Sequence, residues 1–388
     1  MRHFGDQQGD QSWDEQLRYQ RLQQRQRLGA MLLGAYCLGV YCLGVYCLSL
    51  WSGGSGAIAE EQPHIPQVYL AQNAPFVVQT PTQYLQTQGS PSQRATSPAQ
   101  SLDAAKVLDR LATLQVVYLG ETHDQAEDHE LQLAIIQALY QRQPKLVIAM
   151  EMFQRPYQSA IDRFLGGEID TNTLLRQTEY EKRWGFPWQF YEPIVQFAKQ
   201  KQIPVIALNV PTEVTRKVGR KGLTSLTIAE RRFIPPLSAI EMGPEPYQTK
   251  LRELYDSFHS RKGSQTGFHH FFQAQVLWDE TMAERISQIL QQQPDRLVVV
   301  LAGQGHVWEG HGIPRRVARR LSRSANLQQS IILLTPDAEL LQQLTPTSAD
   351  YLWDAMRSPQ PIQPPENTTE PPGKLEPQAV DKSNPKSK

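Results

Sequence analysis

Cysteine is almost absent from this chain, and the few cysteines that it has lie close together. Cys37, Cys42 and Cys47 all fall within one apolar stretch near the N-terminus of the 388-residue sequence. The remaining chain therefore has no means of forming disulfide bonds, zinc–thiolate sites or a cysteine nucleophile. This pattern does not fix the redox compartment, although it suits an exported protein that avoids stray thiols.

The chain also lacks an excess of charge of either sign. Its 39 lysines and arginines balance its 39 aspartates and glutamates, and no block of basic residues stands out. A nucleic-acid partner is therefore not expected. A hydrophobic content of 40%, 28 prolines and a mean hydropathy of -0.48 indicate a globular core diluted by polar segments.

One long apolar run lies near the N-terminus. Residues 30–51 carry no charge, and as a helix they would span about 33 Å, close to the core of a bilayer. By the positive-inside rule, the arginines before this run place residues 1–29 in the cytoplasm and the rest of the chain outside it. We therefore expect a cell-membrane protein whose folded domain is on the periplasmic side. These arginines are Arg18, Arg21, Arg25 and Arg27.

Two interpretations of this run remain open. It is either an uncleaved transmembrane signal anchor or a long signal peptide that is cut after the Ala57-Ile58-Ala59 pattern. Residues 52–101 are rich in Gln, Pro, Ser and Thr and lack periodicity, as is typical of a disordered linker. A proline-rich tail over residues 346–388 has the same character, which leaves residues 102–345 as one folded domain.

Within this domain, five short apolar runs predict β-strands. The runs are nearly all apolar rather than alternating, as in strands that are covered on both faces. Segments with helical spacing, such as Asp128–Arg142, separate them. Together they predict an α/β fold with a mostly parallel sheet, helices on both faces and a helical insert over about residues 210–295. The five runs are Gln115–Leu119, Leu146–Met150, Pro204–Leu208, Leu297–Leu301 and Ser330–Leu334.

The first four predicted strands are each followed by residues with chemical capacity. Because the carboxyl ends of parallel strands lie along one edge, where ligands bind, we expect these residues to converge in a pocket. The acid, base or ligand candidates are Glu121, His123, Glu151 and His306. Further pocket candidates are Gly120, Asn209, Gly303 and Gly305 at strand ends and Asp279 on a helix.

Imidazoles and carboxylates support two kinds of chemistry. Together they bind a divalent metal ion, or they act as a general base and acid in which a glutamate orients an imidazole. Each residue also has a purely structural explanation. Glu121 suits the start of a helix, and Asn209 suits the cap of the helix that follows. The joint pattern of two histidines and two glutamates at matching strand ends favours a functional pocket.

Two groups of residues outside this pattern are weaker indicators of function. The aromatic residues within 183–191 either wall an apolar ligand or pack in the ordinary way. The arginines Arg315, Arg316, Arg319 and Arg320 predict a solvated helix face.

The order of these motifs resembles the ChaN-like haem-binding lipoprotein family. That family belongs to a wider group that includes TIKI-type metalloproteases and erythromycin esterases. The resemblance spans about residues 115–335. Its motifs, in chain order, are GETH at 120–123, EMF at 151–153, WQFYEPI at 188–194, ALN at 207–209, QVLWDETMA at 275–283 and AGQGH at 302–306.

The resemblance implies an exported, membrane-attached bacterial α/β protein that binds haem for iron uptake or haem handling. It also implies a homodimer that holds two haems face to face, with a tyrosine as iron ligand. Tyr247 and Tyr191 are the candidates for that ligand, and Tyr247 is preferred. This chain departs from the family because it has no convincing lipobox and carries an apolar helix instead.

The wider group implies an alternative function. In the TIKI-type relatives the positions matching Glu121, His123, Glu151 and His306 would be metal or catalytic residues, which predicts a metal-dependent hydrolase. The main interpretation is therefore non-enzymatic haem binding, and the alternatives are hydrolysis or a tethered module with another ligand. The sequence does not determine whether the N-terminal helix is cleaved, which tyrosine ligates haem, the substrate, the metal or the oligomeric state.

Overall fold

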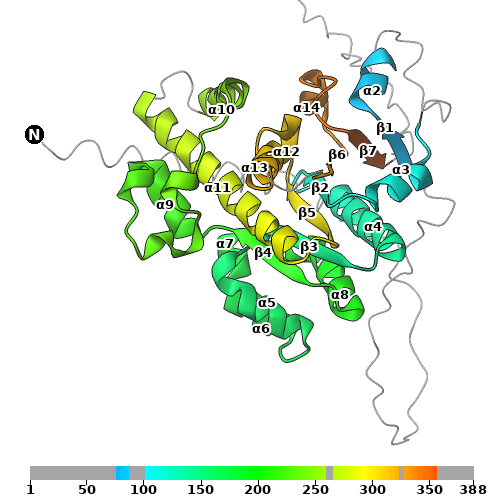
Figure 1. Ribbon diagram of the computed structural model, residues 1–388, viewed down its shortest axis with the longest axis horizontal. Helices are drawn as coiled ribbons and strands as arrows, with labels where there is room; N and C mark the ends of the chain where they lie inside the picture. Colours follow the sequence, from blue (N-terminus) through cyan, green and yellow to red (C-terminus); the bar gives the residue numbers. More distant parts are fainter. Residues whose placement is uncertain (1–75, 88–100, 259–264, 323–326, 356–388) are drawn as a thin grey trace, which may run out of the picture. The chain divides into compact units, whose positions relative to one another are not determined.

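A seven-stranded β-sheet organises the protein (Figure 1). The computed structural model describes residues 76–87, 101–258, 265–322 and 327–355. The sheet has the order β1-β7-β6-β2-β5-β3-β4, and within the described residues every neighbouring pair is parallel except the antiparallel β1–β7 pair. The strands are β1 (Phe76–Gln79), β2 (Val116–Glu121), β3 (Leu146–Gln154), β4 (Val205–Asn209), β5 (Leu297–Gly303), β6 (Gln329–Leu334) and β7 (Tyr351–Ala355). The predicted α/β class with a mostly parallel sheet is confirmed.

Alternate residues of the central strand β2 enter two different hydrophobic cores. Val117 and Leu119 pack in a core with α3, α4, α5 and α8. Val116 and Tyr118 pack in a second core with α11 and α13. Because successive side chains of a strand point to opposite faces, helices must cover both sides of the sheet, which explains the uniformly apolar strands. These helices are α3 (Ala104–Leu111), α4 (Ala126–Arg142), α5 (Gln158–Leu165), α8 (Glu192–Lys201), α11 (Gln265–Gln292) and α13 (Ile313–Arg320).

The segment between β4 and β5 is helical, as predicted. It contains α9 (Thr212–Lys221), several 3₁₀ turns, α10 (Glu245–Phe258) and the 28-residue helix α11. Helix α11, yellow in Figure 1, lies along β4 and β5, so the last part of the insert is a layer of the fold. The other α-helices of the described residues are α2 (Pro81–Thr87), α6 (Thr171–Thr178), α7 (Tyr180–Arg183), α12 (Gln304–Val307) and α14 (Ala338–Gln342).

The folded region extends beyond the predicted boundaries at residues 102 and 345. Strands β1 and β7 and helix α2 lie in segments whose composition predicts a linker and a tail. Composition misleads here because β1 has only four residues and its partner β7 is remote in the sequence. The side chains of Val78 and Trp353 are both 0% exposed, so these strands contribute to the core.

The predicted N-terminal segments, residues 1–29 and 30–51, lie outside the described residues. So do the rest of the predicted linker up to residue 75, residues 88–100, and the tail after residue 355. Among the helices that the structure describes, none combines the length and the apolar character needed to cross a bilayer. Membrane attachment therefore stays a prediction from the sequence.

Replacing Trp353 tests whether β7 belongs to the core. We expect Trp353→Ala to lower the free energy of unfolding by about 3–5 kcal/mol, because it removes a fully buried indole. Denaturant unfolding of the full-length protein measures this change. Ile228→Ala is the control, because Ile228 is 89% exposed and its truncation should change stability by less than about 0.5 kcal/mol. Equal effects of the two substitutions would contradict the placement of β7.

Candidate functional site

The carboxyl ends of four adjacent strands bring the predicted site residues together. Strands β2, β5, β3 and β4 are neighbours in the sheet, and Glu121 at the end of β2 is in register with Gly303 at the end of β5. At the carboxyl ends of the other two strands, Gln154 of β3 is in register with Asn209 of β4. Parallel register therefore gathers segments that are far apart in the sequence at one edge of the sheet.

Glu121 holds the imidazole of His123. Glu121 is only 1% exposed, and its carboxylate accepts hydrogen bonds from His123 Nδ1 at 2.8 Å, from the Tyr191 hydroxyl at 2.5 Å and from Gln132 Nε2 at 2.5 Å. Since a carboxylate only accepts, the proton of the neutral imidazole is on Nδ1. Nε2 of His123 therefore carries the free lone pair.

Asp279 holds His306 in the same way. Asp279 lies on α11 and is 1% exposed, and its Oδ1 accepts a 2.6 Å hydrogen bond from Nδ1 of His306. Its Oδ2 accepts a 2.5 Å bond from the Tyr247 hydroxyl and lies 3.8 Å from a guanidinium nitrogen of Arg316. The structure thus contains two carboxylate–imidazole pairs, each backed by a tyrosine.

Glu151 lies between these two pairs. Its Oε2 accepts a 2.8 Å hydrogen bond from the backbone N–H of Gly303, and its Oε1 lies 3.4 Å from His306 Nε2. The side-chain amide of Asn209 donates to the backbone carbonyl of Glu151 at 3.0 Å. The hydrogen bonds at the Glu151 carboxylate and backbone therefore fix this residue from two neighbouring strands.

Glycine at position 303 permits this close approach. A Cβ atom at Gly303 would lie 2.9 Å from Cε1 and from Nε2 of His123 and 3.8 Å from Glu151 Oε2. The imidazole therefore lies directly against the backbone, where any side chain would displace it. A Cβ atom at Gly120 would meet Val307 and Leu333 instead, so Gly120 serves close packing, whereas the space beside Gly305 is open.

The charges of the site support one another. Burial favours the neutral form of Glu151, but the His306 and His123 imidazoles and the Gly303 N–H outweigh it and lower the pKa of Glu151 to about 2. Burial also opposes the charged form of His306, yet Glu151 and Asp279 hold the pKa of His306 well above its ordinary value. For His123, burial is again outweighed, here by Glu121 and Glu151, and the pKa is raised. The stable arrangement is an ionised Glu151 beside a protonated His306.

Both candidate haem-ligating tyrosines are buried at this site. Tyr191 is 0% exposed and Tyr247 is 5% exposed, and their hydroxyls donate to Glu121 and Asp279 respectively. Burial raises the pKa of both phenols well above the ordinary value. In this geometry each tyrosine positions the carboxylate behind a histidine, and direct iron ligation by either of them stays a prediction.

Aromatic side chains flank both imidazoles. The ring of His123 lies 4.7 Å from Trp184 and 5.0 Å from Phe186, and the ring of His306 lies 6.2 Å from Trp278, measured between centroids. The side chains of His123 and His306 keep 24% and 15% of their surface exposed. The predicted aromatic cluster thus forms an apolar wall beside the exposed imidazole of His123.

Sequence reasoning missed the residues that support Glu121 from α4. Besides Gln132, these are His129, which stacks on Phe190, and Asp128, which accepts a 2.7 Å hydrogen bond from the backbone N–H of Thr122. Burial raises the pKa of Asp128 to about 8. Asp128 and Gln132 are one helical turn apart on α4, and this polar pair within an apolar face is the signal that points to them.

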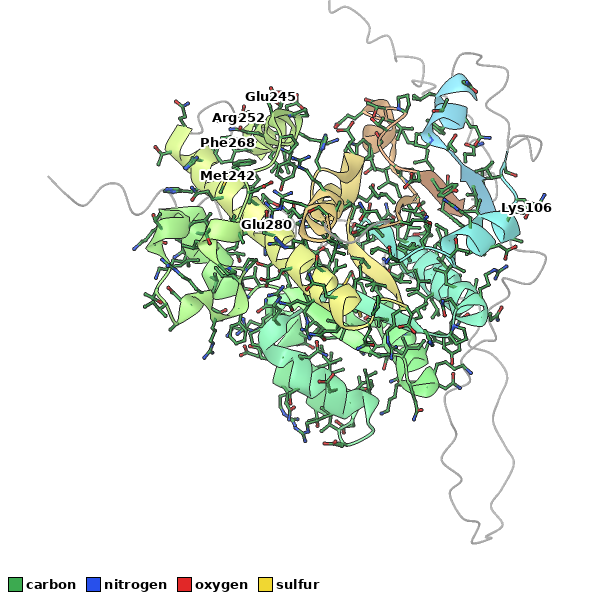
Figure 2. The ribbon with its side chains drawn as sticks, viewed as in Figure 1. Lys106, Met242, Glu245, Arg252, Phe268 and Glu280 are labelled. Atoms are coloured by element: carbon green, nitrogen blue, oxygen red, sulfur yellow. The ribbon has the colours of Figure 1, made fainter. Side chains whose placement is uncertain are left out.

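The predicted solvated arginine face is wrong for three of its four residues. Arg316 is 2% exposed, and Arg316, Arg319 and Arg320 all contact the fully buried Glu280 at 3.4, 2.8 and 2.6 Å. Glu280 lies on α11, where it is labelled in Figure 2. The three arginines lie on α13, which packs on α11, and a buried carboxylate attracts the guanidinium groups inward. Arg315 alone of the four is exposed, and no sequence pattern indicates that Glu280 is buried.

A metal site formed by Glu121, His123, Glu151 and His306 receives no support from the structure. Among the residues described, no group of three or more histidine, cysteine, aspartate or glutamate side chains is placed to hold a metal ion. Both oxygens of Glu121 already accept hydrogen bonds from tyrosine and glutamine side chains, and Oε2 of Glu151 accepts one from the Gly303 backbone.

Comparison with known proteins identifies related sequences and folds. The family model described as haem-binding uptake, Tiki superfamily, ChaN matches residues 107–317. The chain is also 26% identical over 275 residues to the chloroplastic protein RETICULATA-RELATED 5 of Arabidopsis thaliana, a match that covers 66% of this chain and 36% of that protein. The chain thus spans little more than a third of this curated relative.

A solved structure shares the fold. ChaN of Campylobacter jejuni, solved with cofacially bound haem, is similar at a TM-score of 0.54 and 16% identity, over 72% of this chain and 96% of that one. An erythromycin esterase mutant in its open conformation is similar at a TM-score of 0.37 and 13% identity, over 67% of this chain and 76% of that one. At 16% identity the likeness to ChaN concerns the fold alone.

Acid titration of stability tests the charge arrangement around Glu151. Because the pKa of Glu151 is lowered from 4.5 to about 2 on folding, its ionised form stabilises the protein above about pH 4.5, and this contribution is lost as the pH falls toward 2. Glu151→Gln removes it, so we expect the loss of stability from this substitution to be larger at pH 6 than at pH 3.

Denaturant midpoints at the two pH values measure this difference. Glu181→Gln, which alters an exposed carboxylate of α7, is the matched control and should show no comparable pH dependence. An equal cost of Glu151→Gln at both pH values would show that Glu151 does not titrate in this way.

Proposed function

Because the chain belongs to the ChaN haem-binding uptake family of the Tiki superfamily, we propose that it binds haem at the carboxyl edge of its sheet. The observation that carries this proposal is the pair of imidazoles whose Nδ1 atoms are fixed by carboxylates. A histidine that ligates a metal commonly donates its other ring N–H to a carboxylate, which orients the ring and raises its basicity. Histidine is also a common axial ligand of haem iron.

The residues at the carboxyl edge of the sheet suit both the iron and the flat macrocycle of a haem. His123 is the preferred iron ligand, because its side chain is the more exposed of the two imidazoles and lies beside Trp184 and Phe186. These rings offer an apolar surface to a flat macrocycle. When bound, haem would supply a ferric centre and its own redox chemistry, while Glu121 and Tyr191 orient the imidazole from behind.

We further propose the finer parts of this function on the basis of the sequence. The apolar run at residues 30–51 would attach the protein to the cell membrane and place the folded domain on the periplasmic side. There it would serve in haem uptake or handling. A second copy of the chain would complete a homodimer around the haem.

An absorption spectrum of the full-length protein with added haemin tests haem binding. We expect a shifted Soret band that is lost or displaced in His123→Ala, because the imidazole is the proposed ligand. His306→Ala should weaken binding less. His269→Ala is the matched control, since His269 is an exposed histidine on α11 that lies remote from His123 in the sequence.

The same spectra test tyrosine ligation. If Tyr191→Phe or Tyr247→Phe abolishes the band while His123→Ala preserves it, a tyrosine holds the iron and the histidine assignment is wrong. If the wild-type protein gives no shifted Soret band, the haem proposal itself fails.

The same geometry favours a second candidate function, which is hydrolysis. Two imidazoles oriented by carboxylates, with Glu151 between them, form an arrangement suited to general acid–base catalysis. His123, oriented by Glu121, would accept a proton from water, and a protonated His306 would donate one to the leaving group.

Hydrolysis of p-nitrophenyl acetate by the full-length protein tests this alternative. We expect His123→Ala to lower the rate by roughly 10²–10⁴-fold if the imidazole is a general base, and His269→Ala to leave it unchanged. Loss of activity on treatment with EDTA would contradict this metal-free arrangement. If the wild-type protein and the His123→Ala variant hydrolyse this substrate at the same rate, this imidazole does not catalyse the reaction.

A further inference from the structure

A polar cavity is lined by residues other than those of the imidazole site. It has a volume of about 430 Å³ and lies among the segment that follows β3, the 3₁₀ turn Glu230–Phe233 and helix α11. Its lining includes Arg155, Arg232, Phe233, Glu284, Arg285 and Gln288. This volume is within the range of small-molecule sites, about 300–1,000 Å³.

The cavity carries an excess of positive charge. Three guanidinium groups, from Arg155, Arg232 and Arg285, line it together with a single carboxylate, that of Glu284. Oε2 of Glu284 is 2.8 Å from Nη1 of Arg155, so the negative charge of Glu284 is matched to Arg155. Among the described residues, Arg232 and Arg285 form no ion pair, and Arg285 donates only to the neutral side chain of Gln288. Two positive charges are thus left for a ligand.

Hydrogen bonds hold the guanidinium of Arg155 in one orientation at the wall of this cavity. Only 11% of its side chain is exposed. Its Nη1 donates to the Phe233 carbonyl at 3.1 Å, and its Nη2 donates to the Thr281 carbonyl. These bonds fix the guanidinium plane between the 3₁₀ turn and α11. Its Nε–H is buried and donates to no group in the described part of the protein. A buried N–H of this kind favours an acceptor oxygen.

We propose that this cavity binds a small anion that carries two or more carboxylate or phosphate groups. Arginine binds both groups through paired N–H···O hydrogen bonds, and its charge persists at every physiological pH. One acidic group would contact the fixed guanidinium of Arg155, and another would contact Arg232 and Arg285 at the more exposed side. This site and the haem site use different residues, so the proposal does not depend on haem binding.

Calorimetric titration of the full-length protein with citrate and with pyrophosphate tests the proposal, at constant ionic strength. We expect saturable binding of at least one of the two, and the stronger of them identifies the acidic group that the site prefers. Arg232→Ala/Arg285→Ala should weaken this binding by about tenfold or more, since it removes charge-assisted hydrogen bonds. Arg232→Ala alone, which alters an exposed side chain, should reduce the affinity in the same direction and serves if the double variant misfolds.

Arg216→Ala is the matched control. Arg216 lies on α9 in a separate basic groove with Lys217 and Arg220, so its substitution removes the same charge without touching the cavity. Unchanged affinity in this control supports a specific site. Equal weakening in Arg216→Ala and Arg232→Ala would reveal non-specific attraction and overturn the proposal, as would the absence of binding by both anions.

Discussion

The hydrogen bond from the backbone N–H of Gly303 to Glu151 is the interaction around which the rest of the site is arranged. It joins β5 to β3, two neighbouring parallel strands, at the edge where both end. It leaves the second oxygen of Glu151 directed at His306, and it leaves the Gly303 backbone bare for the ring of His123. One short contact thus determines where both imidazoles lie, because a side chain at position 303 would displace His123.

The carboxylates of Glu121 and Asp279 hold the two imidazoles in place. Glu121 and Asp279 each accept one bond from a histidine and one from a tyrosine hydroxyl, although the first lies on a strand and the second on α11. Buried carboxylates are costly unless they are paired, and in this protein each is paired with an imidazole and hydrogen-bonded to a neutral hydroxyl. The tyrosines therefore reduce the desolvation cost of the two anions while they leave the exposed edges of the imidazoles open.

The sequence was sufficient to predict the central strands and the convergence of the four motifs at their ends. Uniformly apolar runs identify buried parallel strands, and parallel strands share an edge, so Glu121, Glu151 and His306 had to meet. The edge strand β1 could not be predicted in this way, because a run of four residues is too short to identify a strand without knowledge of its partner β7. The prediction of a solvated arginine face was wrong for a related reason. Burial of Arg316 depends on the burial of Glu280, a property of packing between two helices that neither helix shows in its own pattern.

Helix α11 contributes one carboxylate each to the imidazole site, the arginine cluster and the anion cavity. Asp279 contacts His306, the adjacent Glu280 contacts the arginines of α13, and Glu284, one turn further, contacts Arg155. Neighbouring residues of a helix point about 100° apart, so Asp279 is rotated toward His306, whereas Glu280 and Glu284, one turn apart, share a face. Arg316 lies between Asp279 and Glu280 and contacts both carboxylates. Arg320 interacts with both Glu280 and Glu284, which places the arginine cluster between the imidazole pair and the anion cavity. The helix thus separates two sites of different chemistry, because the direction of each carboxylate follows from its position in the helical turn.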